Sequence, residues 1–486
     1  MNSSAHMSRG PIWLLFFLLL WALSASAQNP FWREPLRLTN SPYITNGAEM
    51  AESGGIIHVV CNDSWIYGEN GVYYYHSLDG GLSFSQGTRL DNDSSAWAQM
   101  PAVAAFAQKV HVVYEEHPNI GADVHIAYRR STDAGVHWDS TQILNADAIR
   151  PRVACQGDTV YVLYNIVDEP RHSRFRYSYD AGRHWSQEIQ LYPECVYPDL
   201  TACDGQVFIA YQHYIYPINE IYLRGSLNGG QSWQDPVQVS LSPGIPSQAP
   251  HIAVESGGFM AISWFDHENA PPGFTGYIQV RTSSDYGDNF ASVEVVSTTP
   301  YCTSNDIAVC NRIVHVAYND ERWGITYSGV YYRQSLDRGS NWDPEEALSA
   351  DSSRAQYPTI VAIPDWVYVV WEMSDSTGED LYFIDGELAL GMKASPIMVP
   401  SDVAFQIYPN PANPAAVASF ELQVPSHVML NVFDLLGRKI AILANGWFQA
   451  GRHQFAFNAL KLSAGVYWVK LNYAGKVEVK PLTVTK

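Results

Sequence analysis

The sequence predicts an all-β protein in which a seven-bladed β-propeller is followed by a small C-terminal β-sandwich. Three observations support this prediction: a short turn phrase occurs six times, an apolar strand occurs seven times, and short alternating strands with glycine turns fill the C-terminal part. A period of about 50 residues built from short strands is typical of a propeller blade or a solenoid turn. The chain has 486 residues, 47% of them hydrophobic, which suffices for one large repeat domain and one small domain.

The turn phrase is first written "SLDGGLSF", at residues 77–84, and five near copies follow. An aspartate side chain accepts hydrogen bonds from backbone N–H groups just ahead of it, and glycine adopts dihedral angles closed to other residues. A structural role is predicted for these carboxylates, because one active site does not need six equivalent groups. The predicted turn anchors are Asp79, Asp133, Asp180, Asn228, Asp285 and Asp337.

The apolar strand recurs seven times, from "IIHVVCND" at residues 56–63 to "WVYVVWEM" at residues 366–373. The seventh repeat has no turn phrase after it, so its blade lacks an outer strand. The segment "FWREPLRLT", residues 31–39, resembles the text that follows the other turns. We therefore expect this N-terminal segment to close the last blade, which removes exposed sheet edges.

Residues 1–27 are predicted to be a secretory signal peptide. The segment has one early arginine, an apolar stretch over residues 12–23 and small residues at Ala25 and Ala27. Its apolar core is too short to span a bilayer. Cleavage is expected after Ala27, and the mature chain is predicted to contain no transmembrane segment.

After a predicted linker at residues 391–403, residues 404–486 contain three separated motifs in order. These are Tyr-Pro-Asn-Pro at 408–411, Gly-Arg at 437–438 and Ser-x-Gly-Val-Tyr at 463–467. This part resembles the C-terminal sorting domain of the bacterial type IX secretion system. The resemblance implies that the type IX machinery is a partner, and that the protein passes through the periplasm to be released or attached at the outer cell surface.

The turn phrases themselves resemble the Asp-box, or BNR, repeats of sialidases and other secreted propellers. The propeller is assigned to residues 28–390. The resemblance implies blade structure and leaves the activity open, since one fold hosts many functions.

Charge divides along the same boundary. Residues 401–486 carry 8 basic and 4 acidic residues, whereas the preceding 400 residues carry 21 basic and 45 acidic ones. A propeller this acidic is a poor partner for nucleic acid or anionic lipid. The protein is expected to be a monomer with a glycan or protein ligand.

Cofactors and disulfides are less constrained by the sequence. Two cysteine pairs, Cys195 with Cys203 and Cys302 with Cys310, could be bridged only if the chain folds back between them. Buried free thiols are the alternative. Three histidines share one position in the apolar strand, but zinc-ligand spacing is absent, so no metal site is predicted. No cofactor is expected, with a carboxylate-bound calcium ion as the alternative.

Ligand binding is predicted where the loops after the second strands and the loops entering the first strands open onto one face. The candidate binding residues are Asp63, Glu116, Asp266, Asp320, Glu321, Arg322 and Glu372. Other polar groups after the second strands are Glu115, Asp168, Glu169, His213 and His267, and the entering loops add Trp97, Arg150, Tyr197 and further side chains named below. Aromatic rings and carboxylates on one face suit sugar recognition.

Two functions of different classes remain. The favoured one is recognition of a glycan or protein without chemistry. The alternative is a sialidase-type exo-glycoside hydrolase, which requires three arginines and a tyrosine nucleophile. The candidates for those roles are Arg152, Arg322, Arg354, Tyr301 and Tyr357. Against the enzyme, the Arg-Ile-Pro motif of sialidases is absent, and sialidases resemble six-bladed rings whereas seven repeats occur here.

Overall fold

A computed structural model describes residues 30–388 and 405–485 of the chain. Within these ranges it leaves out residues 42–43, 65–69, 92–96, 119–122, 168–171, 192–194, 216–217, 242–244, 268–275, 325–326, 350–353, 376–377, 411, 413–414, 423–425, 434–438, 449–450, 459–462 and 474–475. The predicted signal peptide and linker lie outside the described residues. Contacts divide the chain into two compact units, residues 1–391 and 392–486, which are treated separately.

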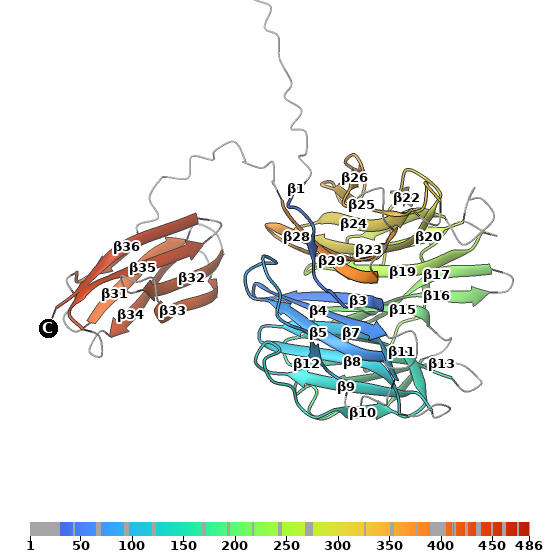
Figure 1. Cartoon of the computed structure of the whole chain (residues 1–486), viewed down its shortest axis with the longest axis horizontal. Coiled ribbons are helices and arrows are strands. Elements are labelled where there is room, and N and C mark those ends of the chain that lie inside the picture. The colour runs from blue at the N-terminus through green and yellow to red at the C-terminus, as the bar shows by residue number, and fades with distance from the viewer. Residues whose placement is uncertain are drawn as a thin grey trace, which may run out of the picture. The chain divides into compact units, whose positions relative to one another are not determined.

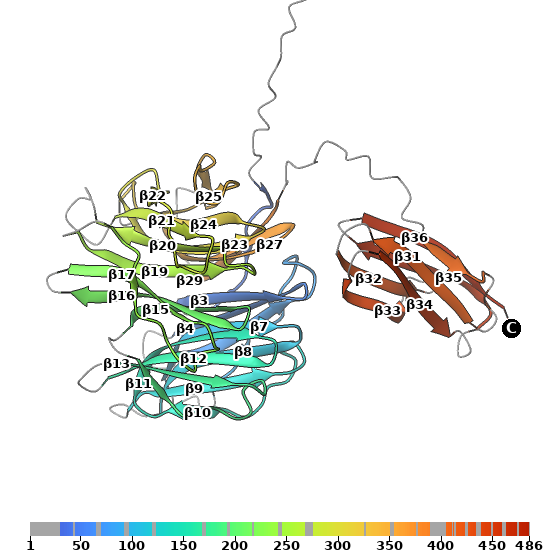
Figure 2. The ribbon, with the colours of Figure 1, turned by 180° about the vertical axis from the view of Figure 1, so that it is seen from behind.

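The first unit is built from antiparallel groups of consecutive strands (Figures 1 and 2). Groups one to three are β3 (Ile44–Ser53), β4 (Ile56–Ser64), β5 (Asn70–Ser77) and β6 (Thr88–Arg89); β7 (Trp97–Phe106), β8 (Lys109–His117), β9 (His125–Ser131) and β10 (Gln142–Asn145); and β11 (Ala148–Gln156), β12 (Thr159–Ile166), β13 (His172–Ser178) and β14 (Ile189–Leu191).

Groups four to six repeat this order. They are β15 (Val196–Cys203), β16 (Gln206–Ile215), β17 (Ile218–Ser226) and β18 (Val237–Gln238); β19 (Ser247–Val254), β20 (Met260–Asp266), β21 (Tyr277–Ser283) and β22 (Glu294–Val295); and β23 (Cys302–Cys310), β24 (Ile313–Asp320), β25 (Gly329–Ser335) and β26 (Glu346–Ala347). The seventh group has β27 (Arg354–Ile363), β28 (Trp366–Asp375) and β29 (Gly378–Glu387). Four-stranded sheets of this kind are those of propeller blades.

The N-terminal segment supplies the outer strands of the seventh group. Strands β1 (Phe31–Trp32) and β2 (Leu36–Arg37) both pair antiparallel with β29. Thr39 Oγ1 donates to Asp380 Oδ1 over 2.8 Å, and Arg37 forms an ion pair with the same carboxylate. The predicted pairing of residues 31–39 with the last group is therefore present.

Hydrophobic side chains pack between neighbouring groups. The second strands are apolar on both faces, and all eight residues of β24 are buried. One buried cluster combines Val60 and Tyr74 of the first group with Val112 of the second, and further clusters join each later group to the next. The cluster containing Ile57 and Val370 joins the first group to the seventh.

The second unit contains two antiparallel sheets. The smaller one has β30 (Gln406–Tyr408), β31 (Ala415–Leu422) and β34 (Gly451–Asn458), and the larger one has β33 (Lys439–Phe448), β32 (Ser426–Phe433), β35 (Gly465–Tyr473) and β36 (Lys476–Val484). Both sheets contribute side chains to one buried cluster, among them Phe420 from the smaller and Leu471 from the larger. The unit therefore has a hydrophobic core of its own.

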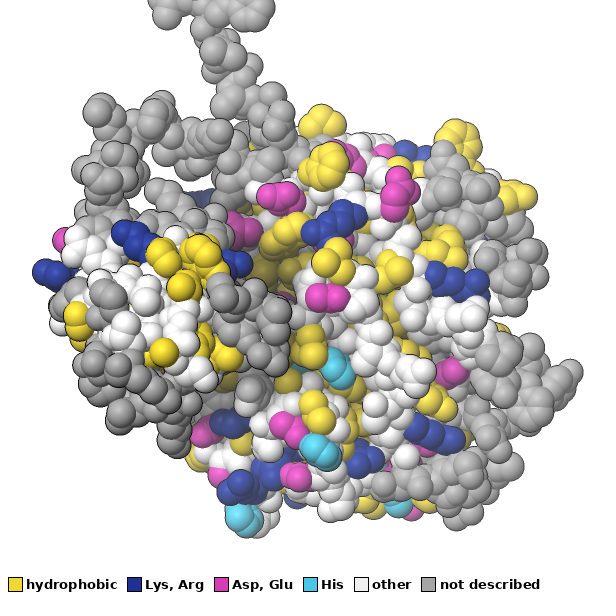
Figure 3. Space-filling view, turned by 60° about the vertical axis from the view of Figure 1, so that its left-hand side comes forward, with side chains coloured by type: hydrophobic (Ala, Val, Ile, Leu, Met, Phe, Trp, Pro, Cys, Tyr) yellow, Lys and Arg dark blue, Asp and Glu magenta, His cyan; other side chains and the backbone are white. Residues whose placement is uncertain are grey.

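The described residues contain no helix that is long and apolar enough to cross a bilayer. On the face drawn in Figure 3, acidic and basic side chains are interspersed with hydrophobic ones.

Candidate functional site

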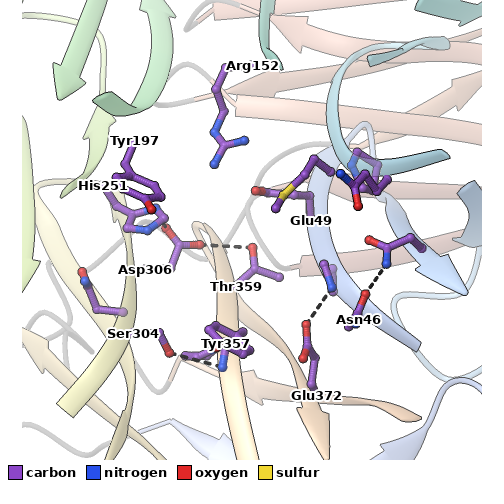
Figure 4. Close-up of a pocket in the computed structure, with 18 of the residues that line it drawn as sticks. Asn46, Glu49, Arg152, Tyr197, His251, Ser304, Asp306, Tyr357, Thr359 and Glu372 are labelled. Carbon is purple, nitrogen blue, oxygen red and sulfur yellow. Dashed lines mark hydrogen bonds and ion pairs between the residues drawn. The ribbon is translucent and has the colours of Figure 1, made fainter. Parts of the chain in front are cut away.

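A cavity of about 710 Å³ lies where the first strands of the first unit begin. The side chains that line it come from β3, β7, β11, β15, β19, β23, β27 and neighbouring strands. Figure 4 shows ten of them converging on the open space. The walls of the cavity are therefore shared by all seven strand groups.

Each of the seven first strands carries a β-bulge at the cavity. The pairing register shifts between Asn46 and Glu49 in β3, for example, and at the equivalent place in β7, β11, β15, β19 and β27, whereas in β23 it shifts earlier, between Cys302 and Ser304. A bulge inserts one extra residue, bends the strand and redirects the next side chain.

Most bulges are conformationally strained. Five contain a residue in the left-handed region directly before a proline, namely Met100, Arg150, Tyr197, Ala249 and Tyr357, with φ between 46° and 55°. This conformation costs roughly 1–2 kcal/mol for a residue with a side chain, and a following proline disfavours helical conformations further. In β3 the position is Gly47, where the same conformation carries no such cost.

Acceptors on adjacent groups hold the strained backbone in place. The N–H of Gly47 donates to Glu372 Oε1 over 2.6 Å, and the N–H of Arg150 donates to Glu115 Oε1 over 2.7 Å. The N–H of Tyr357 donates to Ser304 Oγ over 3.2 Å. Each bond crosses from one strand group to its neighbour, so the bulges also tie the groups together.

One register position in the first strands, which directly follows the bulge in six of them, carries a residue that differs from group to group. The seven equivalent residues are Glu49, Ala102, Arg152, Asp199, His251, Asp306 and Thr359. In Figure 4, Glu49, Arg152, His251, Asp306 and Thr359 surround the open space. The repeated bulge thus presents a different functional group from nearly every strand group.

His251 lies between two of these carboxylates. Its Nδ1 is 3.3 Å from Asp306 Oδ1 and 3.9 Å from Asp199 Oδ2. Burial lowers the pKa of His251, but the hydrogen bond and charge of Asp306, with the charges of Asp199 and Glu49, outweigh burial and raise it to about 9. The imidazole is therefore protonated at neutral pH.

Two glutamates in the cavity wall hold their protons more tightly than usual. Burial raises the pKa of Glu49 to about 7, with Arg152 opposing the rise and Asp306 and Asp199 adding to it. Burial also raises the pKa of Glu372 to about 8, although the N–H of Gly47 lowers it. Carboxyl groups that titrate near neutrality can exchange a proton with a ligand.

The rim of the cavity is aromatic and exposed. Trp97, Met100, Tyr197 and Tyr357 each expose between 47% and 55% of their surface. The Arg150 guanidinium lies 4.2 Å from the centre of the Tyr197 ring. Exposed rings above a polar floor form the usual wall of a sugar-binding pocket.

Among the candidate binding residues predicted from sequence, Glu372 lines the cavity. The Ser41 hydroxyl donates to the Asp63 carboxylate, with its Oγ 2.9 and 2.8 Å from the two carboxylate oxygens, and buried Asp266 accepts from Ser247 over 2.8 Å. Glu116 is buried outside the cavity lining. These three side chains are not among the described ones that line the cavity, and they make contacts within the protein.

Asp320 and Arg322 belong to another cluster. Asp320 is fully buried and accepts from the N–H and the guanidinium of Arg322, over 2.7 and 2.8 Å. Arg322 also donates to Glu345 over 2.8 Å and lies 4.2 Å from the ring centre of Tyr331. Glu321 accepts from Gln356 and does not line the cavity. Asp320 and Arg322 likewise are not among the described residues that line the cavity.

Only some of the candidate residues for sialidase chemistry lie at the cavity. Arg152 and Tyr357 line the cavity, whereas Arg322, Arg354 and Tyr301 are not among the described residues that do. Arg354 interacts electrostatically with Glu372 and Tyr357 of the cavity wall, whereas Arg322 is paired with Asp320 and Glu345. Asp168 and Glu169 lie outside the described residues.

Sequence reasoning missed Glu49, His251, Asp306 and Thr359. A third repeat, with a proline directly before the equivalent residue in five of seven groups, would have found His251 and Thr359, whereas Glu49 and Asp306 follow Ala48 and Asn305 and carry no such signal. These prolines are Pro101, Pro151, Pro198, Pro250 and Pro358.

The repeated turn phrases lie at the other end of the strands, as the pairing of Ile57 with Ser77 shows. In the second copy Asp133 Oδ1 accepts from Ser131 Oγ and from the N–H of His137, each over 2.8 Å, and the N–H of Gly135 donates to Ser131 Oγ. The same bonds recur around the other five anchors, Asp79, Asp180, Asn228, Asp285 and Asp337. This is the arrangement expected of a turn anchor.

The three histidines at the shared position make structural contacts. Nδ1 of His58, His111 and His315 lies 2.7 to 2.8 Å from the hydroxyl of a tyrosine in the adjacent strand. Burial lowers the pKa of all three, that of His58 to about 4. Within the part of the chain that is described, no cluster of three or more metal-ligating side chains occurs.

None of the six cysteines forms a disulfide. Of the two alternatives, the bridges are excluded because Cys195 directly precedes β15 and Cys203 ends it, and Cys302 and Cys310 lie at opposite ends of β23. An extended strand of eight residues holds its ends about 26 Å apart, far beyond a disulfide.

Residues 406–485 match the family model of the secretion system C-terminal sorting domain. The second unit therefore carries this domain, which indicates export to a secreted or outer-surface location. No curated protein matches the chain.

Several solved structures are similar to the chain at low identity. One is a protein of unknown function from Dyadobacter fermentans, with 14% identity over 62% of this chain and 97% of that chain, and a TM-score of 0.44. A mutant of the NanB sialidase from Streptococcus pneumoniae has 14% identity over 74% and 71%, with a TM-score of 0.44. Trypanosoma rangeli sialidase in complex with sialic acid has 10% identity over 93% and 88%, also with a TM-score of 0.44. None of these similarities assigns an activity to this chain.

Proposed function

We propose that the protein is an exported, monomeric β-propeller that binds a glycan in its central cavity without cleaving it. The observation that carries this proposal is the combination of an exposed aromatic rim, formed by Trp97, Tyr197 and Tyr357, with a floor of charged and amide side chains. Rings stack on the apolar faces of sugars, and carboxylates and amides bind their hydroxyl groups.

Binding is favoured over sialidase chemistry because of the arginines. Three guanidinium groups are needed to hold the carboxylate of the sialidase substrate, and Arg152 is the arginine among the described residues that line the cavity. Arg322 is engaged instead with Asp320 and Glu345. The proposal includes no cofactor.

The proposed architecture is a closed ring of seven blades, completed by residues 31–39, with the C-terminal unit as a β-sandwich. The buried cluster that joins the first and seventh groups supports ring closure, as does the pairing of β1 and β2 with β29.

Deletion of residues 28–41 from the mature protein tests ring closure. The deletion unpairs the edge of β29 and removes Trp32, whose ring centre lies 4.9 Å from that of Tyr332. We expect the free energy of unfolding to fall by about 5 kcal/mol or more, measured by chemical denaturation. A loss below about 1 kcal/mol would contradict the closing role.

The rim residues test the binding function. Mature protein is titrated against a panel of glycans, and Tyr197→Ala and Trp97→Ala are expected to weaken the best ligand about tenfold or more. Tyr179→Ala is the matched control, because this ring is 55% exposed next to a turn anchor at the other end of the strands. Release of free sugar from chromogenic glycosides, or equal losses in Tyr197→Ala and Tyr179→Ala, would reject the proposal.

A further inference from the structure

The balance of charge in the cavity distinguishes between classes of sugar. Four carboxyl groups surround it: Glu49, Asp306 and Glu372 in the wall, and Asp199 beside His251. Two basic groups, Arg152 and His251, face them. With every group ionised, the described residues at the cavity carry an excess of negative charge.

The basic groups are already balanced by partners within the protein. His251 lies between Asp306 and Asp199, so this trio as a whole is negative. Arg152 interacts electrostatically with Glu49, and its Nη1 donates to the carbonyl of Pro151 over 3.1 Å. Among the described residues that line the cavity, a ligand carboxylate would therefore meet no uncompensated cation; Arg150 lies outside this lining, over the Tyr197 ring.

Glu49 is the carboxyl group most available to a ligand. Its side chain points into the cavity in Figure 4, and no hydrogen bond joins it to another described residue. Asp306, in contrast, accepts from Thr359 Oγ1 and from the N–H of Ile360, over 3.1 and 2.8 Å. The groups that face Glu49 from the other strands are Arg152, Asp199, His251 and Asp306.

The aromatic rim favours the same sign of charge. The faces of Trp97, Tyr197 and Tyr357 carry negative electrostatic potential, and each ring is about half exposed at the mouth, although Arg150 already covers one face of Tyr197 and His117 stacks on Trp97. Aromatic faces combined with carboxylates form the usual binding environment of an ammonium group.

We propose that the sugar bound in this cavity carries a free ammonium group, as in an unacetylated hexosamine, and that Glu49 accepts a hydrogen bond from it. This inference rests on the proposed glycan-binding function. Arg152 then donates to the hydroxyl or ring oxygens of the same sugar. The raised pKa values of His251, Glu49 and Glu372 fit this assignment, since the empty cavity stabilises protons and not anions.

A comparison of three oligosaccharides tests the proposal on the mature, full-length protein. The probes are a short oligomer of glucosamine, the same oligomer fully N-acetylated, and an oligomer of galacturonate, titrated by calorimetry at about pH 6. We expect the glucosamine oligomer to bind at least about tenfold more tightly than the N-acetylated one, and the galacturonate oligomer most weakly.

Two variants identify the group that recognises the ammonium. Glu49→Gln keeps the shape of the side chain and is expected to remove the preference for the free amine. Glu52→Gln on the same strand is the control, because Glu52 does not line the cavity. Binding of the amine should also release a proton from Glu49 in the wild-type protein, detected as a dependence of the heat on the ionisation enthalpy of the buffer, and Glu49→Gln should lose this release.

The outcomes separate the two proposals. Equal or tighter binding of the N-acetylated or galacturonate oligomer would overturn the ammonium assignment and leave glycan binding intact, as would a full preference for the amine in Glu49→Gln. Failure of all three oligomers and of the wider glycan panel to bind would overturn both.

Discussion

The two ends of the first unit differ in what is repeated: side-chain hydrogen bonds at one end and a backbone conformation at the other. At the turn-phrase end, six copies repeat the same side-chain hydrogen bonds, as those of Asp79 and Asp285 illustrate. At the cavity end, six strands repeat the same backbone bulge, but the residue after the bulge changes from Glu49 to Arg152 to His251. Repeated side-chain chemistry therefore builds structure here, while a repeated backbone with varied side chains builds the candidate site.

Left-handed backbone at residues with a side chain occurs at both ends, since Ala134, Ala181, Tyr286 and Arg338 adopt it in the turn phrases, but among the described residues only at the cavity end does such a residue directly precede proline. At the cavity end, Tyr197 and Tyr357 adopt left-handed conformations directly before proline and expose their rings at the rim. At the turn end, Gly135 takes the left-handed position at no cost, and a side chain there would collide with the Tyr74 ring of the neighbouring group. Strain that persists in a fold is typical of functional sites.

The largest predicted contrast is in the dependence of stability on pH. The folded state raises the pKa of Glu49 from 4.5 to about 7, so stability is lost as pH rises through this interval, by about 3 kcal/mol at most. His251, with its pKa raised from 6.5 to about 9, contributes stability that is complete below 6.5 and lost as pH rises through 9.

The turn anchors act in the opposite direction. Hydrogen bonds from Ser83 and Ser77 lower the pKa of Asp79 to about 2, and those from His137 and Ser131 do the same for Asp133. Their contribution is complete above 3.8 and is lost as pH falls towards 2. The free energy of unfolding should be measured by denaturation at pH values between 2 and 9. In Glu49→Gln its dependence on pH should become weaker between pH 4.5 and 7 and stay unchanged elsewhere. If Glu49→Gln instead weakened the pH dependence of stability between pH 2 and 3.8, the proposed difference between the two ends would be wrong.

A smaller effect is expected from Asp337→Ala. Asp337 accepts from Ser335 Oγ, from the N–H of Asn341 and from Asn341 Nδ2, over 2.9, 2.8 and 2.6 Å. Because the site is exposed, the free energy of unfolding should fall by only about 1 kcal/mol, with ligand affinity unchanged in the folded protein. Weakened binding at unchanged stability would mean that the turn end takes part in recognition.

The smallest effect is expected from Asn228→Asp, which gives the fourth turn the anchor that the other five have. Asn228 Oδ1 accepts from the N–H of Ser232 over 2.9 Å, and its Nδ2 donates to Ser232 Oγ. A carboxylate would accept both bonds with charge assistance, as Asp79 does from Ser83, so stability should rise by about 0.5 kcal/mol. A decrease measured by the same denaturation assay would show that the six turns are not equivalent.

Some residues predicted from the sequence line the cavity, and others lie on the opposite face of their strand. Glu372 pairs with Gln356 at the bulge, in the same register as Asn62 with Asn46, and both Glu372 and Asn62 line the cavity. Asp63 and Asp320 come one residue later in their strands. Side chains alternate between the two faces of a strand, so a shift of one residue directs these carboxylates away from the cavity.

The sequence by itself determined the repeat: the strand groups, the turn anchors, the pairing of residues 31–39 and the sorting domain all follow from local patterns that recur or match a family. Only the tertiary structure decided the site. Glu49, Arg152, His251 and Asp306 are dozens of residues apart, and nothing local distinguishes them from solvated charges. Their chemistry arises because neighbouring strand groups bring them around one cavity, where burial and mutual charge change their proton affinities, and such long-range proximity is not a property of any short stretch of sequence.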